Sequence, residues 1–315
     1  MIEILLAAYN GEKYIKRQLR SILANSEQDF HITVRDDGST DHTVQVVRAL
    51  ANKYPEKITL VEDGKPTGSA AGNFMQMVHD LPEDTEYVMF ADQDDIWSRH
   101  KLSDSLSFMK DMELSYGAQV PLLMHTDLMV VDENEQIISR SLIEYMQLPY
   151  KDDLKHLLLQ NSVTGCTILM NNALLKLLKR ACDSDEIIIH DHYAAVLAAA
   201  FGHVGCVRIP TVKYRQHGDN EVGASDAKSL SYKMRRLKRG KKEFANSMDA
   251  GYKQAALLVS LYPEEVAKMS EADRELLTGY AELIKKTHKE RVKFFRKHEM
   301  YKRSFSRMIM QMIWS

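Results

Sequence analysis

The sequence predicts an α/β fold in which a mostly parallel central sheet is flanked by helices. In the first 131 residues, short apolar runs alternate with amphipathic stretches whose apolar residues recur at helical spacing. The connecting stretches are long enough to be crossover helices between parallel strands. The composition, 44% hydrophobic and 27% charged over 315 residues, is that of a globular chain and excludes collagen-like, coiled-coil and disordered classes.

Each element follows from its own pattern. Apolar runs predict strands at residues 2–8, 31–36, 58–62, 87–91 and 122–131. Helical spacing predicts helices at residues 14–24, 43–53, 73–81 and 101–113, with Asp41 as the N-cap of the second. After residue 150 the pattern predicts strands at 165–170 and 206–213 and helices at 154–159, 173–182 and 191–201. Beyond residue 225 only helical patterns remain.

The charge distribution divides the chain in two. Residues 1–225 carry 21 Lys and Arg against 33 Asp and Glu, whereas residues 226–315 carry 21 against 11. We therefore expect an acidic α/β domain at 1–225 that can host a cation, followed by a basic helical extension at 226–315 that can face an anionic surface.

The sequence predicts a cytoplasmic protein. No stretch approaches the roughly 20 apolar residues of a membrane-spanning helix. The apolar N-terminus lacks the basic leader and the cleavage pattern of a signal peptide. Three cysteines, Cys166, Cys182 and Cys206, cannot all pair within one chain and are expected as free thiols.

A first acidic motif, Arg-Asp-Asp-Gly-Ser-Thr-Asp at residues 35–41, follows a predicted strand. In open α/β sheets ligands bind beyond the carboxyl ends of strands, where Asp36 and Asp37 can accept hydrogen bonds from a nucleobase or a ribose. A turn followed by a helix cap would also explain this motif. The glycine-containing stretch before Asn73 is a weaker candidate for a phosphate-binding loop.

A second acidic motif, Asp-Gln-Asp-Asp-Ile-Trp at residues 92–97, follows another strand. Acids this close repel each other unless a cation or hydrogen-bond donors compensate. Asp92 and Asp94 are spaced to approach one Mg²⁺ or Mn²⁺ together. The alternative is a solvated acidic turn, although the neighbouring Trp97 suits a walled pocket better.

Two later motifs carry candidate catalytic groups. Asp191 lies between two histidines at the predicted start of a helix, where it is either a general base or an N-cap. After the last predicted strand, Arg215 could offset phosphate charge and His217 could bind a metal, or be a structural histidine.

The order of these motifs along residues 1–220 resembles that of inverting glycosyltransferases of family 2, which have the GT-A fold, a Rossmann-like sheet flanked by helices. The forms at 92–97 and at 214–218 are most similar to bacterial rhamnosyltransferases of cell-wall and capsular polysaccharide synthesis. The resemblance makes residues 1–225 the catalytic domain.

The resemblance also assigns roles to individual residues. The nucleotide-sugar donor would be bound by Asp36, Asp37, Asn73, Asp92 and Arg215. A divalent cation, Mn²⁺ or Mg²⁺, would be held by Asp94 and His217, with Asp92 close by. The catalytic base would be Asp191, and the acceptor site would include Thr164, Gly165, Trp97 and His190.

The resemblance implies dTDP-β-L-rhamnose as donor and a growing polyprenyl-linked glycan as acceptor. Relatives that use UDP-hexoses or UDP-galactofuranose share the two acidic motifs, so a UDP-sugar donor stays open, as does a non-catalytic homologue that only binds the sugar. Phosphoryl transfer and dinucleotide redox chemistry are disfavoured because the chain has neither a Walker-type loop nor a GxGxxG motif after the first strand.

The basic extension predicts contact with anionic lipid, and the resemblance implies that this contact is at the inner face of the plasma membrane. Seven of the ten residues at 233–242 are Lys or Arg. One helix face would carry Phe305, Met308, Ile309, Met312 and Ile313, with Lys302, Arg303 and Arg307 nearby. The alternative is packing on the catalytic domain or homodimerisation. Nucleic-acid binding is disfavoured because no aromatic residues are interleaved with the basic run.

Overall fold

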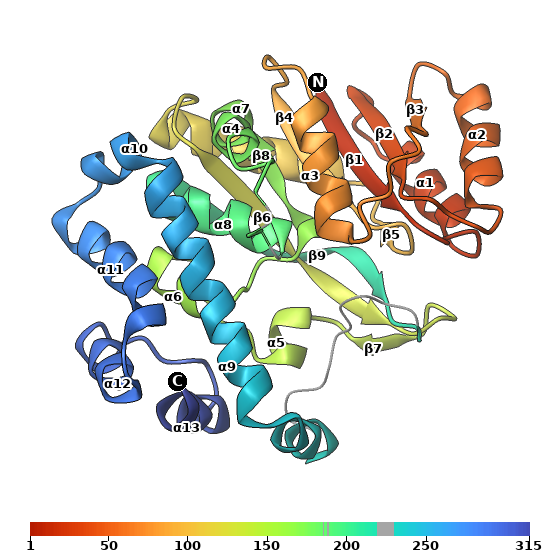
Figure 1. Ribbon diagram of the computed structural model, residues 1–315. Helices are drawn as coiled ribbons and strands as arrows, with labels where there is room; N and C mark the ends of the chain where they lie inside the picture. Colours follow the sequence, from red (N-terminus) through yellow and green to blue (C-terminus); the bar gives the residue numbers. More distant parts are fainter. Residues whose placement is uncertain (185, 188, 219–229) are drawn as a thin grey trace.

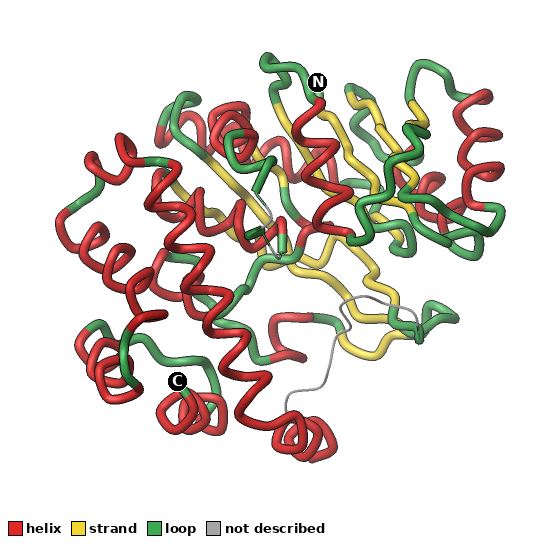
Figure 2. The backbone as a smooth tube through the Cα atoms, in the orientation of Figure 1, coloured by secondary structure: helices red, strands yellow, loops and turns green. Residues whose placement is uncertain are grey.

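The computed structural model describes residues 1–184, 186–187, 189–218 and 230–315, with side chains except at 230–239. Its centre is a nine-stranded sheet in the order β3-β2-β1-β4-β8-β6-β9-β5, and β7 pairs with β6 (Figures 1 and 2). The strands are β1 (Ile2–Ala8), β2 (Phe30–Asp36), β3 (Ile58–Val61), β4 (Tyr87–Ala91), β5 (Ile96–Trp97), β6 (Leu122–Val131), β7 (Ile137–Ser139), β8 (Leu169–Asn171) and β9 (His203–Arg215). The predicted α/β class is confirmed.

Helices surround this sheet and form the whole of the described C-terminal part (Figure 2). The α-helices are α1 (Ile15–Leu23), α2 (Thr43–Lys53), α3 (Ala70–Asp80), α4 (Lys101–Tyr116), α5 (Leu142–Met146), α6 (Leu154–Leu159), α7 (Asn172–Lys179), α8 (His190–Phe201), α9 (Leu230–Leu261), α10 (Pro263–Lys268), α11 (Glu271–Glu282), α12 (His288–Lys297) and α13 (Phe305–Trp314). Two short 3₁₀ helices are η1 (Gly165–Thr167) and η2 (Leu283–Lys285). Helix α9 is kinked at Gly240, whose φ is 79°.

Strand directions bring the ends of six strands to one edge of the sheet, namely β3, which is parallel to β2, and five others. Strand β1 is parallel to β2 and β4, and β6 is parallel to β9. Strand β8 runs antiparallel to both β4 and β6, so β4 and β6 point the same way. The carboxyl ends of β1, β2, β4, β6 and β9 therefore share one edge, which is where α/β sheets bind ligands.

Alternating side chains of the strands feed two hydrophobic clusters. In β1, Ile4 and Leu6 belong to the cluster under α1, α2 and α4, whereas Leu5 belongs to the cluster under α3, α7 and α8. This period of two is what a strand buried on both faces requires. It explains why β1 is an almost unbroken apolar run in the sequence.

The predicted elements are present with bounds that differ by at most three residues, apart from two local predictions that are wrong. The predicted strand at 165–170 is the 3₁₀ helix η1 followed by β8, because the amides of Thr167 and Ile168 bond back to the carbonyls of Thr164 and Gly165. Asp41 is not the N-cap of α2. The helix begins at Thr43, and its N-cap position is held by His42. Asp41 lies one residue before that position, although its carboxylate accepts from the Thr43 amide at 2.9 Å.

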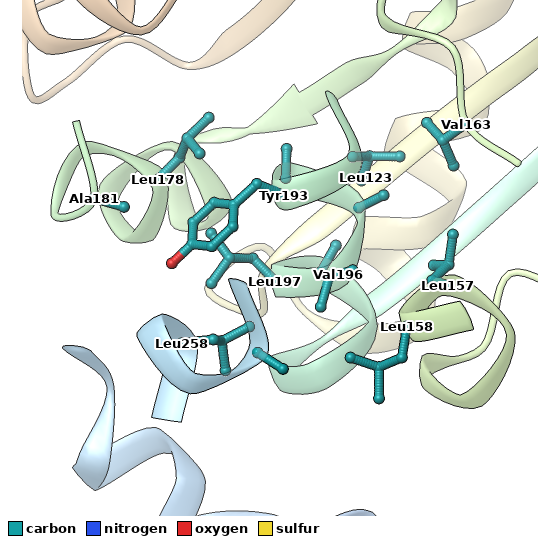
Figure 3. Packing of buried hydrophobic residues seen from close by; sticks show 14 of the residues in the cluster. Leu123, Leu157, Leu158, Val163, Leu178, Ala181, Tyr193, Val196, Leu197 and Leu258 are labelled. Carbon is teal, nitrogen blue, oxygen red and sulfur yellow. The ribbon is translucent and has the colours of Figure 1, made fainter. Parts of the chain in front are cut away.

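The C-terminal helices share a core with the sheet. Leu258 of α9 lies beside Tyr193 and Leu197 of α8 (Figure 3), and Leu277 of α11 and Phe295 of α12 belong to the same buried cluster. The packing alternative for the extension is therefore present in the structure. Within the described part of the chain, no helix combines the length and apolar composition that a membrane span requires.

We expect the extension and the sheet to unfold together. Leu277 is fully buried, and Leu277→Ala should cost about 2–5 kcal/mol of unfolding free energy. The change is best made in a Trp314→Phe background, where the fluorescence of Trp97 in β5 reports on the sheet alone. Urea titration should show the Trp97 transition moving to lower denaturant with Leu277→Ala, and hardly at all with the exposed control Leu114→Ala. An unmoved Trp97 transition would mean that the extension folds separately.

Candidate functional site

A buried arginine organises the acidic motif after β2. The Arg35 side chain is 1% exposed and donates to both carboxylate oxygens of Asp63, to Asp37 Oδ1 at 3.1 Å and to Asn73 Oδ1 at 3.0 Å. It also donates to the Lys65 carbonyl at 2.7 Å. Because a buried guanidinium needs such partners, this network fixes the loop over residues 63–68 against the end of β2.

The predicted nucleotide-binding residues at this end of the sheet have internal partners. Asp37 accepts from the Thr67 amide at 2.7 Å and from the Gly68 amide at 2.8 Å, so its carboxylate shapes the loop. The Asn73 amide nitrogen donates to the Arg35 carbonyl at 3.2 Å. Asp36 turns the other way and accepts from the Ser39 amide at 2.8 Å. These residues lie together at the carboxyl edge of the sheet, as the sequence predicts.

Three acids follow β4, and their surroundings differ. Asp95 is 1% exposed, and burial, followed by the charges of Asp94 and Asp92, raises its pKa well above the usual range. Its Oδ1 accepts from the Arg215 amide at 3.1 Å. Asp92 and Asp94 keep partial exposure. The side chains of Asp92 and Asp94 thus reach the surface of the site, while Asp95 is built into its floor.

The structure brings Asp94 and His217 together although 122 residues separate them along the chain. His217 Nε2 lies 2.7 Å from Asp94 Oδ2, and the side chains of His217 and Asp94 are 11% and 13% exposed. The imidazole also stacks on the Tyr14 ring at 4.9 Å between centroids. Ligands on adjacent corners of an octahedral site with bonds of 2.1 Å stand roughly 3 Å apart. A carboxylate and an imidazole at this spacing fit one divalent cation with little rearrangement.

Arg215 acts between loops. Its guanidinium donates to the Asp94 carbonyl at 2.9 Å and to the Glu133 carbonyl at 2.8 Å, and lies 4.8 Å from the centre of the Tyr14 ring. The side chain is 4% exposed. Arg215 is placed to hold the turn that contains Asp94 against the end of β9, in addition to the electrostatic role that the sequence suggests.

Asp191 begins α8 in a nearly closed environment. Its carboxylate accepts from the Gly165 amide at 2.7 Å and from the Asn161 side chain at 3.2 Å. Burial raises the pKa of Asp191 to about 6, although these bonds and one from the backbone of His192 oppose the shift. An aspartate with this pKa is ionised at neutral pH and still basic enough to accept a proton.

Two consecutive residues of η1 join the Asp191 side of the site to the acidic side. Gly165 donates its amide to Asp191, and the next residue, Cys166, has its sulfur within 4.8 Å of carboxylate oxygens of Asp92 and Asp95. A side chain at Gly165 would crowd this junction, since its Cβ would lie 3.1 Å from His190 Nε2. The two groups of predicted residues are therefore neighbours.

The predicted acceptor residues separate into two places. Gly165 and Thr164, the residue that precedes η1, lie beside Asp191, and His190 stacks on Phe74 at 4.2 Å between ring centroids. Burial lowers the pKa of His190 to about 3, so the ring is a neutral wall. Trp97 does not join this group. It is 3% exposed in the cluster under α1, because Ile96 and Trp97 pair with β9 as strand β5 and turn the ring into the core.

Sequence reasoning missed the residues that support the site. Arg35 belongs to the first motif but its place at the end of an apolar run gave no sign of its many partners. Asn161 and Cys166 lie in the stretch predicted as loop and strand, where no pattern marks a contact with an acid. Asp95 was visible only as a third acid, whose burial depends on β9.

The arrangement can be compared with known proteins. The family model described as "Glycosyl transferase family 2" matches residues 3–167, slightly more than half of the chain. The chain belongs to this family. Its acidic motifs and η1 fall inside the matched region, whereas Asp191 and His217 of this glycosyltransferase lie beyond it.

Individual relatives add detail. The dTDP-rhamnosyl transferase RfbG of Shigella flexneri is 27% identical over 255 residues, covering 75% of this chain and 80% of that protein. The minor teichoic acid biosynthesis protein GgaA of Bacillus subtilis is 28% identical over 125 residues, covering 39% of this chain and 28% of that protein. The crystal structure of S. aureus TarS 1-349 superposes with a TM-score of 0.55 at 17% identity, covering 89% of this chain and 70% of that one. The last likeness shows the shared fold, GT-A.

Proposed function

We propose that this glycosyltransferase moves L-rhamnose from dTDP-β-L-rhamnose to a growing lipid-linked cell-surface polysaccharide, with inversion at the anomeric carbon. The family supplies the class of reaction. The donor rests on the similarity to the rhamnosyl transferase RfbG, and a role in cell-wall polysaccharide synthesis also rests on GgaA, a relative named for minor teichoic acid biosynthesis.

The observation that carries the proposal is the junction at η1. Gly165 bonds to Asp191, and Cys166 lies against the carboxylates after β4. A donor diphosphate near Asp94 and an acceptor hydroxyl near Asp191 would then be held on either side of this short segment. A single displacement needs this arrangement, because the base must act on the side opposite the leaving group.

Asp191 performs the proton transfer in this scheme. Its ionised carboxylate accepts the proton of the acceptor hydroxyl as that oxygen bonds to the anomeric carbon, while the bond from this carbon to the donor phosphate breaks. The Gly165 amide and the Asn161 side chain hold the carboxylate in place. No second carboxylate nucleophile is required, in contrast to a retaining mechanism.

Asp94 and His217, with Asp92 nearby, are the residues that would hold a divalent cation, which enzymes with this fold generally use. Such a cation would offset the negative charge that develops on the departing diphosphate. Asp95 is buried and accepts from the Arg215 amide, which leaves Asp92 and Asp94 as the carboxylates that could meet the ion.

A UDP-sugar is the second candidate donor. The S. aureus TarS structure, which shares this fold, has been solved in complex with UDP-GlcNAc. The Asp36 and Asn73 region of this chain carries no feature that separates thymine from uracil. The donor panel described below distinguishes the two.

We extend the proposal to peripheral contact with the inner face of the membrane. Helix α13 leaves Phe305, Ile309 and Ile313 exposed at 74%, 39% and 59%, at positions i, i+4 and i+8 of one face. An unpartnered apolar stripe of this kind suits the headgroup region of a bilayer. Arg307, one of the basic residues predicted to lie near this stripe, is buried and donates to the Gln147 carbonyl at 3.2 Å, so it faces the protein.

The first prediction concerns the cation. Mn²⁺ together with dTDP should raise the melting temperature more than either alone, because an ion held by Asp94 and His217 would offset the charge of the diphosphate. His217→Ala should weaken this metal-dependent nucleotide binding by more than the roughly 10–100-fold that loss of a mere supporting residue costs. The measurement is scanning fluorimetry over a matrix of nucleotide and metal concentrations.

The matched control is His203→Ala, an exposed histidine at the opposite end of β9 that stacks on Tyr116. It should leave the metal effect unchanged. Replacing dTDP with UDP and GDP in the same assay tests the donor, and a preference for UDP would favour the second candidate. A protein stabilised by no nucleotide with any metal contradicts the proposal.

The second prediction concerns the base. Because Asp191 must be ionised to accept a proton and its pKa is about 6, kcat should fall as the pH drops below about 6 and level off above it. Asp191→Asn should keep nucleotide-sugar binding and lose roughly 10²–10⁴-fold in kcat. Asp183→Asn, an exposed acid shortly before α8, is the control. Near-normal turnover by Asp191→Asn, measured as released dTDP, would remove the residue from this role.

The third prediction concerns α13. Phe305→Ser together with Ile313→Ser should reduce co-sedimentation with vesicles containing anionic lipid, without changing the melting temperature, because both side chains are exposed. Leu114→Ser, 85% exposed on α4, is the control. Equal pelleting of the α13 variant and the control argues against membrane contact. Concentration-dependent mass in light scattering, lost in the same variant, would instead assign the stripe to a dimer.

A further inference from the structure

A second group of metal-ligand side chains lies away from the acidic motifs. His125 of β6, Asp152 before α6 and Cys206 of β9 each offer a ligand atom, and these atoms all lie within 4.8 Å of one another. We propose that these three residues form a Zn²⁺ site, distinct from the cation site at Asp94 and His217.

The backbone brings two of the ligands together. His125 and Cys206 are register partners on the parallel strands β6 and β9, so their side chains leave the sheet on the same face. Asp152 reaches the same point from the segment that leads into α6. A site assembled from two central strands and one loop has little freedom to adopt another shape.

The distances suit a tetrahedral ion. His125 Nε2 lies 3.2 Å from Asp152 Oδ2. A nitrogen and an oxygen bonded at about 2.0–2.1 Å to one tetrahedral Zn²⁺ stand roughly 3.3 Å apart. The imidazole and the carboxylate therefore need hardly move, and the Cys206 sulfur already lies within 4.8 Å of both ligand atoms.

The ligand types select the metal. A thiolate with an imidazole and a carboxylate favours Zn²⁺ over Mg²⁺ or Mn²⁺, which prefer oxygen. The residues proposed for the other site, Asp94, His217 and Asp92, offer only oxygen and nitrogen. Three protein ligands leave a fourth position for water. On binding, the Cys206 thiol proton and the proton between His125 and Asp152 pass to solvent, and the bonds to the metal replace them.

The surroundings support the ligands. The second oxygen of Asp152 accepts from the Ser162 hydroxyl at 2.6 Å, which is the kind of partner that orients a ligating carboxylate. Arg208, the nearest positive group on β9, donates to the Tyr150 carbonyl at 3.3 Å and lies 4.7 Å from the centre of the Tyr150 ring. Its guanidinium is thereby engaged by Tyr150.

The position of the site gives it a role in the reaction. Ser162 follows Asn161, whose side chain bonds to Asp191. A Zn²⁺ ion at His125, Asp152 and Cys206 would tie β6 and β9 to the segment that supports the catalytic base. We therefore assign the ion a positioning role, since none of its ligands contacts Asp191.

The test uses the full chain without a polyhistidine tag, kept reduced with a phosphine and dialysed against chelator-treated buffer. Elemental analysis should find one Zn²⁺ per chain in the wild type. Titration of the metal-free protein with Co²⁺ should produce a thiolate-to-cobalt charge-transfer band in the near ultraviolet. Cys206→Ser should lose both the zinc and the band. Zn²⁺ should raise the melting temperature of the wild type but not that of Cys206→Ser.

Cys182→Ser is the matched control, since Cys182 is also a partly buried free thiol but belongs to no such group among the described residues. It should keep the zinc content and the cobalt band of the wild type. Asp94→Asn should keep both as well, which makes this test independent of the transferase reaction. Asp152→Asn, which preserves the hydrogen bond to His125, should weaken Zn²⁺ binding while staying folded. Zinc content in the wild type no higher than in Cys206→Ser, or a cobalt–thiolate band that survives in Cys206→Ser, overturns the proposal.

Discussion

The carboxylates at the carboxyl edge of this sheet repel one another, and two buried guanidinium groups offset this repulsion. Arg35 ends β2 next to Asp37, and Arg215 ends β9 beside the backbone of Asp94 and Glu133; the two arginines are 1% and 3% exposed. A buried charge without partners is very unfavourable, so each arginine and its loop stabilise one another. The loops that would meet a ligand are thereby fixed before the ligand arrives, which lowers the entropic cost of binding.

Differences in neighbouring charge give two similarly buried carboxylates different chemistry. Asp95 and Asp191 are both removed from water, and burial raises the pKa of each. Asp95 also feels the charges of Asp92 and Asp94, which push its pKa further, whereas Asp191 has only hydrogen-bond donors around it and stays within reach of neutral pH. One acid becomes part of the framework and the other keeps the properties of a base.

The sequence predicts the sheet well because its strands are buried on both faces. Continuous apolar runs gave the bounds of β1 and β4 correctly, and alternation within them sent side chains to both clusters. The short elements β5, β7 and α5 could not be seen, since two to five residues carry no period. Trp97 shows the consequence: its neighbouring acids suggested a pocket wall, but pairing with β9, a contact between distant segments, turned it into the core.

The site was predictable as a set of residues and only partly as a geometry. Acid motifs after strands indicate the correct edge of a parallel sheet, and the contact between Asp94 and His217 bears out that expectation across 122 residues. The partners that hold these groups, such as Asn161 for Asp191, come from loops with no pattern. Their positions depend on the packing of α6 and η1, which local sequence does not specify.

Part of the positive charge of the extension is used in contacts within the protein. Arg303 and Arg307 donate to the carbonyls of Leu148 and Gln147, and Arg291 donates to the carbonyl of Leu283 at 2.8 Å. These arginines complete the hydrogen bonding of chain turns, one of them at Gln147, whose φ is 51°. The net charge of the extension therefore overstates the positive charge on its outer surface. The segment that Arg303 and Arg307 contact leads into α6 and on to Asn161, whose side chain donates to Asp191, so these arginines connect the extension to the surroundings of the site.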